Sequence, residues 1–281
     1  MKHALASMPV LLAGALLLAA SQQPAAAQRI VDLEIDDNVV TARLVLPLGL
    51  AAADLTIRFE EVVGLSESSL GLSLSRIGVL NPRLLARLPE LGGLAGGLPM
   101  LLTISPPASG GLSFSGVVEV ELYTRNLHYT QGSPLRLLKA TGLGDFYDIT
   151  DFMGSGSYRV RGTSGGFSVF LIGVEGRSPS AVIEDKYGAL HDLLDDHADS
   201  IPAAVATTLQ NHLDASELGG YGTGDLDLAI DELDDFIDVV EDNAGGTGIP
   251  NVWRSSQDLV NVAGELVAAA RTLRFSLGLA P

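Results

Sequence analysis

Carboxylate side chains in the last third of the chain could bind a metal ion. Asp225, Asp227 and Asp231 carry oxygen ligands at short spacing, and oxygen is the ligand that Ca²⁺ takes in proteins. The run Asp225-Leu226-Asp227 begins like a calcium-binding loop, but glycine is missing at its sixth position and glutamate at its twelfth. Side chains along one helix cannot surround an ion with six or more oxygens. We therefore expect no metal site and no cofactor, and these three residues are the candidate ligands if Ca²⁺ does bind.

Histidine could supply nitrogen ligands for Zn²⁺. His191 and His197 lie with Asp195 in one predicted helix, and His212 lies in the next. Zinc needs three or four converging ligands. Because His191 and His197 are six residues apart, they occupy nearly opposite faces of a helix. We expect these histidines to pack against neighbours or face solvent.

No motif for covalent catalysis or phosphoryl transfer is present in the sequence. Residues 111–115, Gly-Leu-Ser-Phe-Ser, approach a nucleophile elbow, but the last residue is not glycine and the segment reads as a strand. The chain has no cysteine, no Walker loop, no dinucleotide fingerprint and no His-Glu-x-x-His motif. Its many carboxylates lie on predicted helix faces, where no cleft is evident to raise a pKa. We therefore predict no catalytic residue.

The chain is strongly acidic, with 34 Asp and Glu against 17 Lys and Arg. Half of the 34 acidic residues lie between Glu184 and Asp242, where Lys186 is the one Lys or Arg. This charge argues against binding to nucleic acid or to an anionic membrane surface. It favours solubility, cations and a basic protein or surface partner, although charged helix faces usually contact solvent alone.

The first 27 residues have the pattern of a signal peptide. Lys2 and His3 give a positive start, residues 10–20 are apolar, and Ala25-Ala26-Ala27 offers small residues for cleavage after Ala27. The apolar run is shorter than the roughly 20 residues that a membrane-spanning helix needs. Cleavage removes one Lys, which leaves 16 basic and 34 acidic residues, a charge of −18. We expect a secreted or periplasmic protein without a membrane anchor.

Residues 28–177 show the two-residue period of β-strands. Apolar and polar side chains alternate through residues 40–46, 55–60, 70–75, 118–122 and 158–161. Asp36-Asp37-Asn38 separates two β-rich runs and predicts a hairpin. No helix long enough for a parallel crossover separates the strands. The pattern predicts an antiparallel β-sandwich domain.

Residues 178–281 show the period of α-helices and predict an acidic domain of four helices. The clearest helix spans residues 224–243, with Asp225 as its N-cap. Its apolar positions, spaced three and four apart, are Leu226, Ile230, Leu233, Ile237 and Val240. The other helices are expected around residues 181–199, from Pro202, and after Asn251 with an apolar seam that starts at Leu259. The fold class is therefore α+β, a β-sandwich followed by a four-helix bundle.

Two segments resemble parts of secreted bacterial proteins. Residues 135–138, Asp148-Ile149-Thr150 and residues 167–170 have the cadence of the closing strands of sandwich domains in such proteins. A pattern Ala-x-x-x-Leu-x-x-Phe-Ile-x-x-Val and a later Ala/Leu-rich helix resemble the FIMAH-type domain. These positions are Ala229, Leu233, Phe236, Ile237 and Val240, followed by Gly246, Ile249, Leu259, Ala263 and Leu266. The family's usual Asn and Gln positions on the third helix are Asp here. The resemblance implies a C-terminal helical module of an exported protein, without established chemistry.

Two functions follow as hypotheses. The first is a secreted, non-enzymatic accessory or interaction protein with an unidentified protein or surface partner. The alternative is a secreted hydrolase of glycans or peptides with carboxylates on the sandwich loops, which requires a cleft that holds two carboxylates about 5–10 Å apart.

Overall fold

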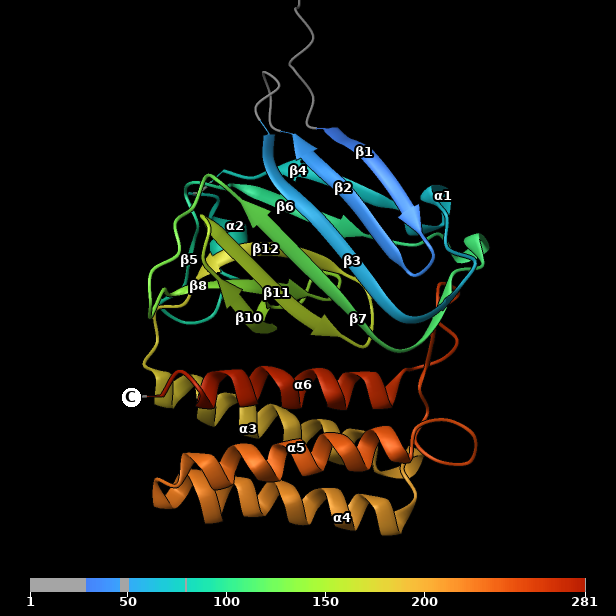
Figure 1. Cartoon of the computed structure of the whole chain (residues 1–281), viewed down its shortest axis with the longest axis vertical. Coiled ribbons are helices and arrows are strands. Elements are labelled where there is room, and N and C mark those ends of the chain that lie inside the picture. The colour runs from blue at the N-terminus through green and yellow to red at the C-terminus, as the bar shows by residue number, and fades with distance from the viewer. Residues whose placement is uncertain (1–28, 46–50, 79, 281) are drawn as a thin grey trace, which may run out of the picture.

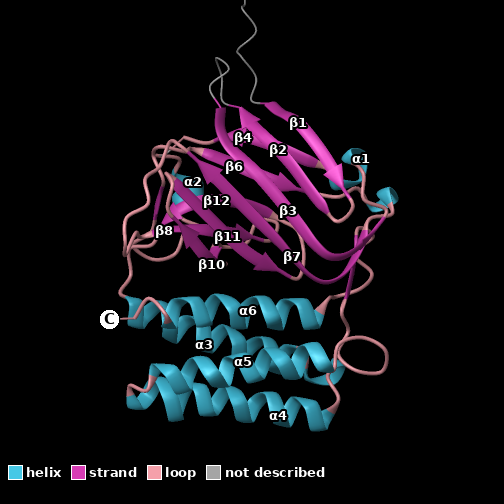
Figure 2. Ribbon diagram, in the orientation of Figure 1, coloured by secondary structure: helices cyan, strands magenta, loops and turns pink. Residues whose placement is uncertain are grey.

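The computed structural model describes residues 29–45, 51–78 and 80–280 of the chain. Two antiparallel β-sheets lie above a layer of helices, so the fold is α+β as predicted (Figure 1, Figure 2). The expected signal peptide lies outside the described residues. None of the helices within those ranges is long and apolar enough to span a membrane.

The first sheet contains the predicted hairpin. Its strands are β1 (Arg29–Asp36), β2 (Val39–Val45), β3 (Ala51–Val63), β7 (Ser113–Thr124), β10 (Thr150–Gly154), β11 (Tyr158–Ser164) and β13 (Val252–Arg254). They are ordered β1-β2-β3-β7-β11-β10, and β13 pairs with the first residues of β7. Asp37 in the hairpin turn has a φ of +53°, a conformation that Asp tolerates better than most residues.

The second sheet and two short helices complete the β-rich part. The strands are β4 (Leu72–Arg76), β5 (Gly93–Leu94), β6 (Met100–Ile104), β8 (Leu135–Ala140), β9 (Tyr147–Asp148) and β12 (Val169–Val174). Their order is β4-β6-β12-β8-β9, with β5 paired to the end of β12. The short helices are α1 (Glu67–Leu70) and α2 (Pro82–Leu85).

Apolar side chains from both sheets share one core. The alternation predicted for β2 is confirmed, because Val40, Ala42 and Leu44 are buried while the residues between them are exposed. Residues of β6, β8 and β12 join the same core from the other side. The buried Tyr158 also links the sheets, since its hydroxyl donates to the carbonyl of Leu135 at 2.9 Å.

Four aromatic rings fill one end of this core. Phe114 on β7 lies 5.7 Å from Phe59 and 5.5 Å from Phe167, both in edge-to-face contact. Trp253 on β13 stacks on Phe114 at 5.4 Å. The cluster therefore attaches β13 to the sheet by side-chain contacts as well as by backbone pairing.

The four long helices expected after residue 178 are present. They are α3 (Pro179–Asp196), α4 (Ala203–Asp214), α5 (Leu226–Asp242) and α6 (Val262–Leu277). Each packs on two others: α3 on α4 and α6, and α5 on α4 and α6. Tyr187, Leu233 and Phe236 are fully buried among them. Burial raises the pKa of Tyr187 to about 12.

The predicted faces of α5 are confirmed. Leu233, Ile237 and Val240 are buried, while Asp227 and Asp231 are exposed. Two further acids of this helix pair with α6, because Asp234 Oδ1 lies 2.6 Å from Arg274 Nε and Glu241 Oε1 lies 3.2 Å from Arg271 Nη2. The acidic face is thus partly neutralised by a neighbouring helix.

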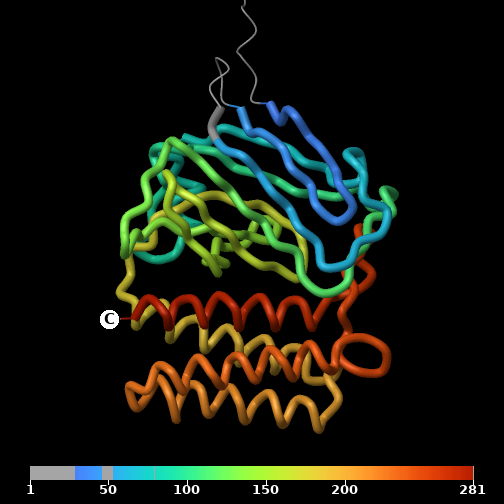
Figure 3. The backbone as a smooth tube through the Cα atoms, in the orientation of Figure 1, coloured from blue at the N-terminus to red at the C-terminus, as the bar shows by residue number. Residues whose placement is uncertain are grey.

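The start of the last helix differs from the prediction. The spacing predicts Leu259 in its apolar seam, but α6 begins at Val262 and Leu259 is 40 % exposed. The chain first returns to the sheet to form β13, as the orange and red part of the tube in Figure 3 shows. Asn261 then caps α6, because its Oδ1 accepts from the backbone N–H of Gly264 at 2.9 Å. Residue pattern alone could not reveal a strand whose partner lies more than 130 residues earlier.

Helix α6 joins the helical layer to the first sheet. It packs on β7, β10 and β11. The Asn261 side-chain amide donates to the carbonyls of Gly116 at 2.6 Å and Gly165 at 3.1 Å. A Cβ atom on Gly165 would lie 2.5 Å from the backbone nitrogen of Glu265, so only glycine permits this approach.

Candidate functional site

A pocket of about 650 Å³ lies at the junction of the strands and the helices. We call it the junction pocket. Its walls come from β8, β9 and β11 on one side and from α3 and α6 on the other, the helices nearest the sheets in Figure 1. Its polar lining residues are Lys139, Thr141, Asp148, Thr163, Ser164, Arg177, Asp185, Lys186, Glu265 and Thr272.

Helical spacing explains the wall that α3 and α6 provide. Val182, Lys186, Ala189 and Leu193 follow one another at three- and four-residue steps on α3, beside the stripe that enters the helical core. Helix α6 contributes two alanines at positions 268 and 269. Because alanine side chains are small, the two helices leave space between themselves and the sheets.

Lys186 lines the pocket and forms an ion pair with Asp148. Its Nζ lies 2.7 Å from Asp148 Oδ2, and it also donates to Thr272 Oγ1 at 2.7 Å and Ser276 Oγ at 2.9 Å. Burial lowers the pKa of Lys186, while the charge of Asp148 opposes that effect. Arg136 lies 3.8 Å from the same carboxylate oxygen. This cluster links α3, α6 and β9 and is saturated with partners.

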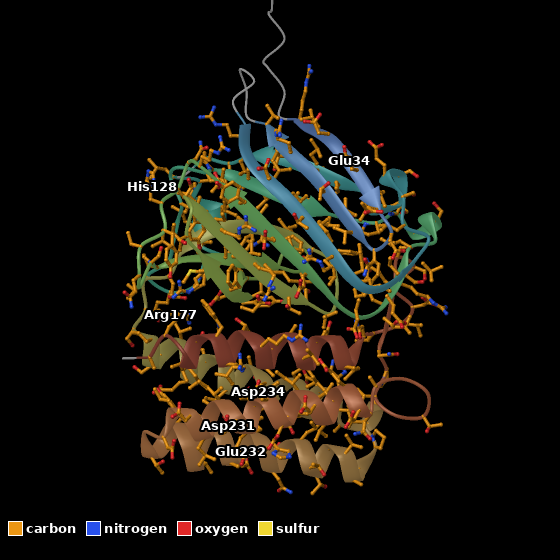
Figure 4. All side chains as sticks on the ribbon, in the orientation of Figure 1. Glu34, His128, Arg177, Asp231, Glu232 and Asp234 are labelled. Carbon is orange, nitrogen blue, oxygen red and sulfur yellow. The ribbon has the colours of Figure 1, made fainter. Side chains whose placement is uncertain are left out.

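Arg177 also lines the pocket and lies between the strands and the helices (Figure 4). Its Nε and Nη2 bind the two oxygens of Glu175 at 2.9 and 2.8 Å, and its Nη1 pairs with Asp185. Burial disfavours the charged form of Glu175, but the hydrogen bonds from Arg177 outweigh burial and lower the pKa of that carboxyl. Arg177 is therefore neutralised by its own neighbours.

Lys139 is the pocket-lining cation that has no carboxylate partner among the described residues. It lies on β8, opposite Phe170 of β12 and Tyr147 of β9, and is 6 % exposed. Its Nζ donates to Ser164 Oγ at 2.6 Å and lies 5.9 Å from the Tyr147 ring centre. Ser164 Oγ in turn donates to the Gly166 carbonyl at 2.6 Å. No carboxylate of the described residues forms an ion pair with Lys139.

The residues considered for Ca²⁺ lie elsewhere, on α5 and at its start. Asp225 is the N-cap, as predicted, and its carboxylate accepts from the backbone N–H of Leu228 at 3.1 Å. Asp227 and Asp231 are exposed, and Figure 4 places Asp231 in the helical layer away from the sheets. Their assignment as Ca²⁺ ligands stays a prediction.

Replacing Asp225 by alanine is expected to destabilise the protein by about 1 kcal/mol, because the first turn of α5 loses its capping acceptor. The loss should be the same in calcium and in EDTA at matched ionic strength, measured by urea unfolding. Asp227→Ala serves as the control, because Asp227 lies two residues later in the same turn and is not the capping residue. A loss that appears in calcium alone would instead assign Asp225 to a metal site.

The histidines of the helical layer each face a glutamate of another segment. His191 Nε2 lies 2.8 Å from Glu217, His197 Nε2 lies 3.6 Å from Glu265, and His212 Nδ1 lies 2.7 Å from Glu232. The last pair has Asp235 beside it, and ligand atoms of His212, Glu232 and Asp235 lie within 4.8 Å of one another. This is a ligand set that zinc accepts. Spacing along the sequence does not reveal these glutamate partners, because helix packing brings them together.

Sequence reasoning also missed Lys139. It lies near the end of β8, a mostly apolar strand whose residue pattern gives no sign of a pocket. The available signal was composition, because Lys139 and Lys186 are the only lysines after Lys2 in a chain with 17 basic residues. Both line the junction pocket.

Comparisons with known proteins give a family for the chain. No curated protein matches it. The model of one family matches residues 14–280, which covers both the strands and the helices. The chain therefore belongs to the family of unknown function DUF6689.

Proposed function

We propose that this protein is an exported, non-enzymatic binding protein that holds a small organic molecule in the junction pocket. The observation that carries the proposal is the pocket of about 650 Å³, whose exposed lining is mostly apolar and includes polar groups from both the strands and the helices. Pockets that bind small molecules usually have volumes of about 300–1,000 Å³ and this kind of lining.

The walls are held in place by contacts between elements that are distant in the sequence. Lys186 and Asp148 join α3 to β9, and Thr272 Oγ1 donates to the Thr150 carbonyl at 2.9 Å to join α6 to β10. Asn261 fixes the start of α6 to Gly116 in β7 and to Gly165, which follows β11. A pocket with fixed walls loses little conformational freedom when a ligand enters, which favours binding.

The chemistry of the lining residues supports binding over catalysis. Asp148, Asp185 and Glu265 are each paired with a cation or a histidine. Acid–base catalysis by two carboxylates needs one that is protonated and one that is free. The Ser164 hydroxyl donates to a carbonyl, so its proton is not directed toward Lys139 as a nucleophile's would be. The hydrolase alternative stays a prediction without supporting geometry.

We also propose that residues 28–177 form a β-sandwich domain and residues 178–281 a four-helix bundle of the FIMAH type, exported by a signal peptide cleaved after Ala27. The core shared by the two sheets and the packing of each long helix on two others support this division. The exposed acids of α5 suit a basic protein partner. The junction pocket would then lie between two domains, a common place for ligands.

Blocking the pocket tests the binding proposal. Octanoate, octanol and octylamine share one apolar chain and differ in their head group, and binding of each is measured by calorimetry. We expect at least one to bind the wild type in a 1:1 ratio and to lose binding in Ala269→Phe, which places a ring in the pocket. Ala204→Phe, on the exposed side of α4, is the matched control and should bind normally. Failure of all three probes, or equal binding to both variants, would refute the proposal.

A further inference from the structure

We propose that the junction pocket selects an organic monocarboxylate, whose carboxylate binds the Lys139 ammonium. This inference rests on the proposed function and names the chemical class of the ligand. Lys139 is buried, and burying an ammonium without a counter-charge is strongly unfavourable. A side chain in this state needs an anion that the described residues do not supply.

The hydrogen bonds of Lys139 leave part of its capacity unused. An ammonium has three N–H donors. One of them donates to Ser164 Oγ at 2.6 Å. Among the described residues, Ser164 is the hydrogen-bond partner of the Lys139 ammonium. Lys186 differs in this respect, because it has four acceptor contacts at 2.7–3.1 Å that include a carboxylate. The donors of Lys139 thus remain available to a ligand.

Each of the lining carboxylates faces a group other than Lys139. Asp148 is bound by Lys186, Asp185 by Arg177, and Glu265 lies 3.6 Å from His197. Within the described residues, the pocket therefore presents one lysine without a carboxylate partner, among acids that face other groups. A singly charged head group matches this balance, whereas a phosphate with two charges would be repelled by the surrounding acids.

The rest of the pocket indicates what the head group is attached to. Phe146, Val182 and Leu193 contribute apolar surface, and Ala268 and Ala269 leave room beside it. Tyr147 lies at the rim, with 48 % of its surface exposed, and its ring contacts the Lys139 ammonium. An apolar body between the helices and a carboxylate at Lys139 would satisfy both parts of the lining.

Head-group preference tests this inference separately from the proposed function. At neutral pH we expect octanoate to bind the wild type about ten- to a hundred-fold more tightly than octanol, the gain typical of a hydrogen bond to a charged group. Octylamine, which is a cation, should bind most weakly. If octanol binds as tightly as octanoate, the pocket binds ligands but the carboxylate inference is wrong. If no probe binds, the proposed function itself fails.

Lys139→Met keeps the length of the side chain and removes its charge. Octanoate affinity should fall about ten- to a hundred-fold, to the level of octanol, while octanol binding stays unchanged. Arg159→Met removes one positive charge from an exposed position outside the pocket and should retain wild-type affinity for octanoate. Equal octanoate binding by Lys139→Met and the wild type would overturn the inference. Should Lys139→Met fail to fold in a thermal melt, the comparison of head groups in the wild type still decides it.

Discussion

Replacing Lys186 by methionine is expected to destabilise the protein by about 3–5 kcal/mol, because Asp148 then stays buried without its main counter-charge. The Asp148 side chain has no exposed surface, and its oxygen lies 2.7 Å from Lys186 Nζ. Arg136, at 3.8 Å, is too distant to replace a direct hydrogen bond. Thr272 and Ser276 would each lose a donor as well. The loss is measured by urea unfolding at neutral pH.

A second substitution separates the ion pair from simple packing. Asp148→Asn combined with Lys186→Met removes both charges, and we expect it to recover a large part of the lost stability. Arg271→Met is the surface control, because Arg271 and Glu241 form an exposed pair at 3.2 Å whose loss should cost less than about 1 kcal/mol. If Lys186→Met costs no more than Arg271→Met, the ion pair does not hold α3 against β9.

Phe114→Ala is expected to destabilise the protein by about 3–5 kcal/mol, because it leaves a cavity among three other rings. Phe114 is 2 % exposed and contacts Phe59, Phe167 and Trp253 at ring distances of 5.4–5.7 Å. The cavity would also weaken the attachment of β13, since Trp253 stacks on the deleted ring. The free energy of unfolding is measured by denaturant titration.

Trp253 reports on this cluster because it is the single tryptophan of the chain. Its emission should shift toward longer wavelength in folded Phe114→Ala as water reaches the indole. Phe152→Ala is the control, because Phe152 on β10 is 40 % exposed and its loss should cost less than about 1 kcal/mol. Equal destabilisation by the two substitutions, with unchanged emission, would contradict a central role for the aromatic cluster.

Local sequence pattern predicted those elements whose structure depends on near neighbours. The apolar stripe with Leu233, Ile237 and Val240 predicted α5 and its buried face, and Asp225 predicted its N-cap. The Asp36-Asp37-Asn38 turn predicted the first hairpin. Helical period, capping and turn chemistry are properties of a few adjacent residues, so a single sequence contains them.

Elements that depend on distant partners were not predicted. Val252–Arg254 became a strand because β7 offers an open pairing position and Phe114 receives Trp253, and neither can be seen from residues 250–261. The late start of α6 has the same cause. The histidine–glutamate pairs likewise required the packing angles of the helices.

The α+β composition, the order of strands before helices, the acidity and most helix faces are predictable from the sequence, because each follows from residue type and short-range period. The tertiary structure, in contrast, creates the junction pocket, because it brings together wall segments that lie more than 120 residues apart in the sequence, such as those of Lys139 and Thr272. It also decided which lysine is neutralised. Lys186 meets Asp148 when α3 packs on β9, whereas Lys139 faces a serine and an open pocket. Charge and polarity can be read from a sequence, but the partner of a buried charge is set by the packing of distant segments.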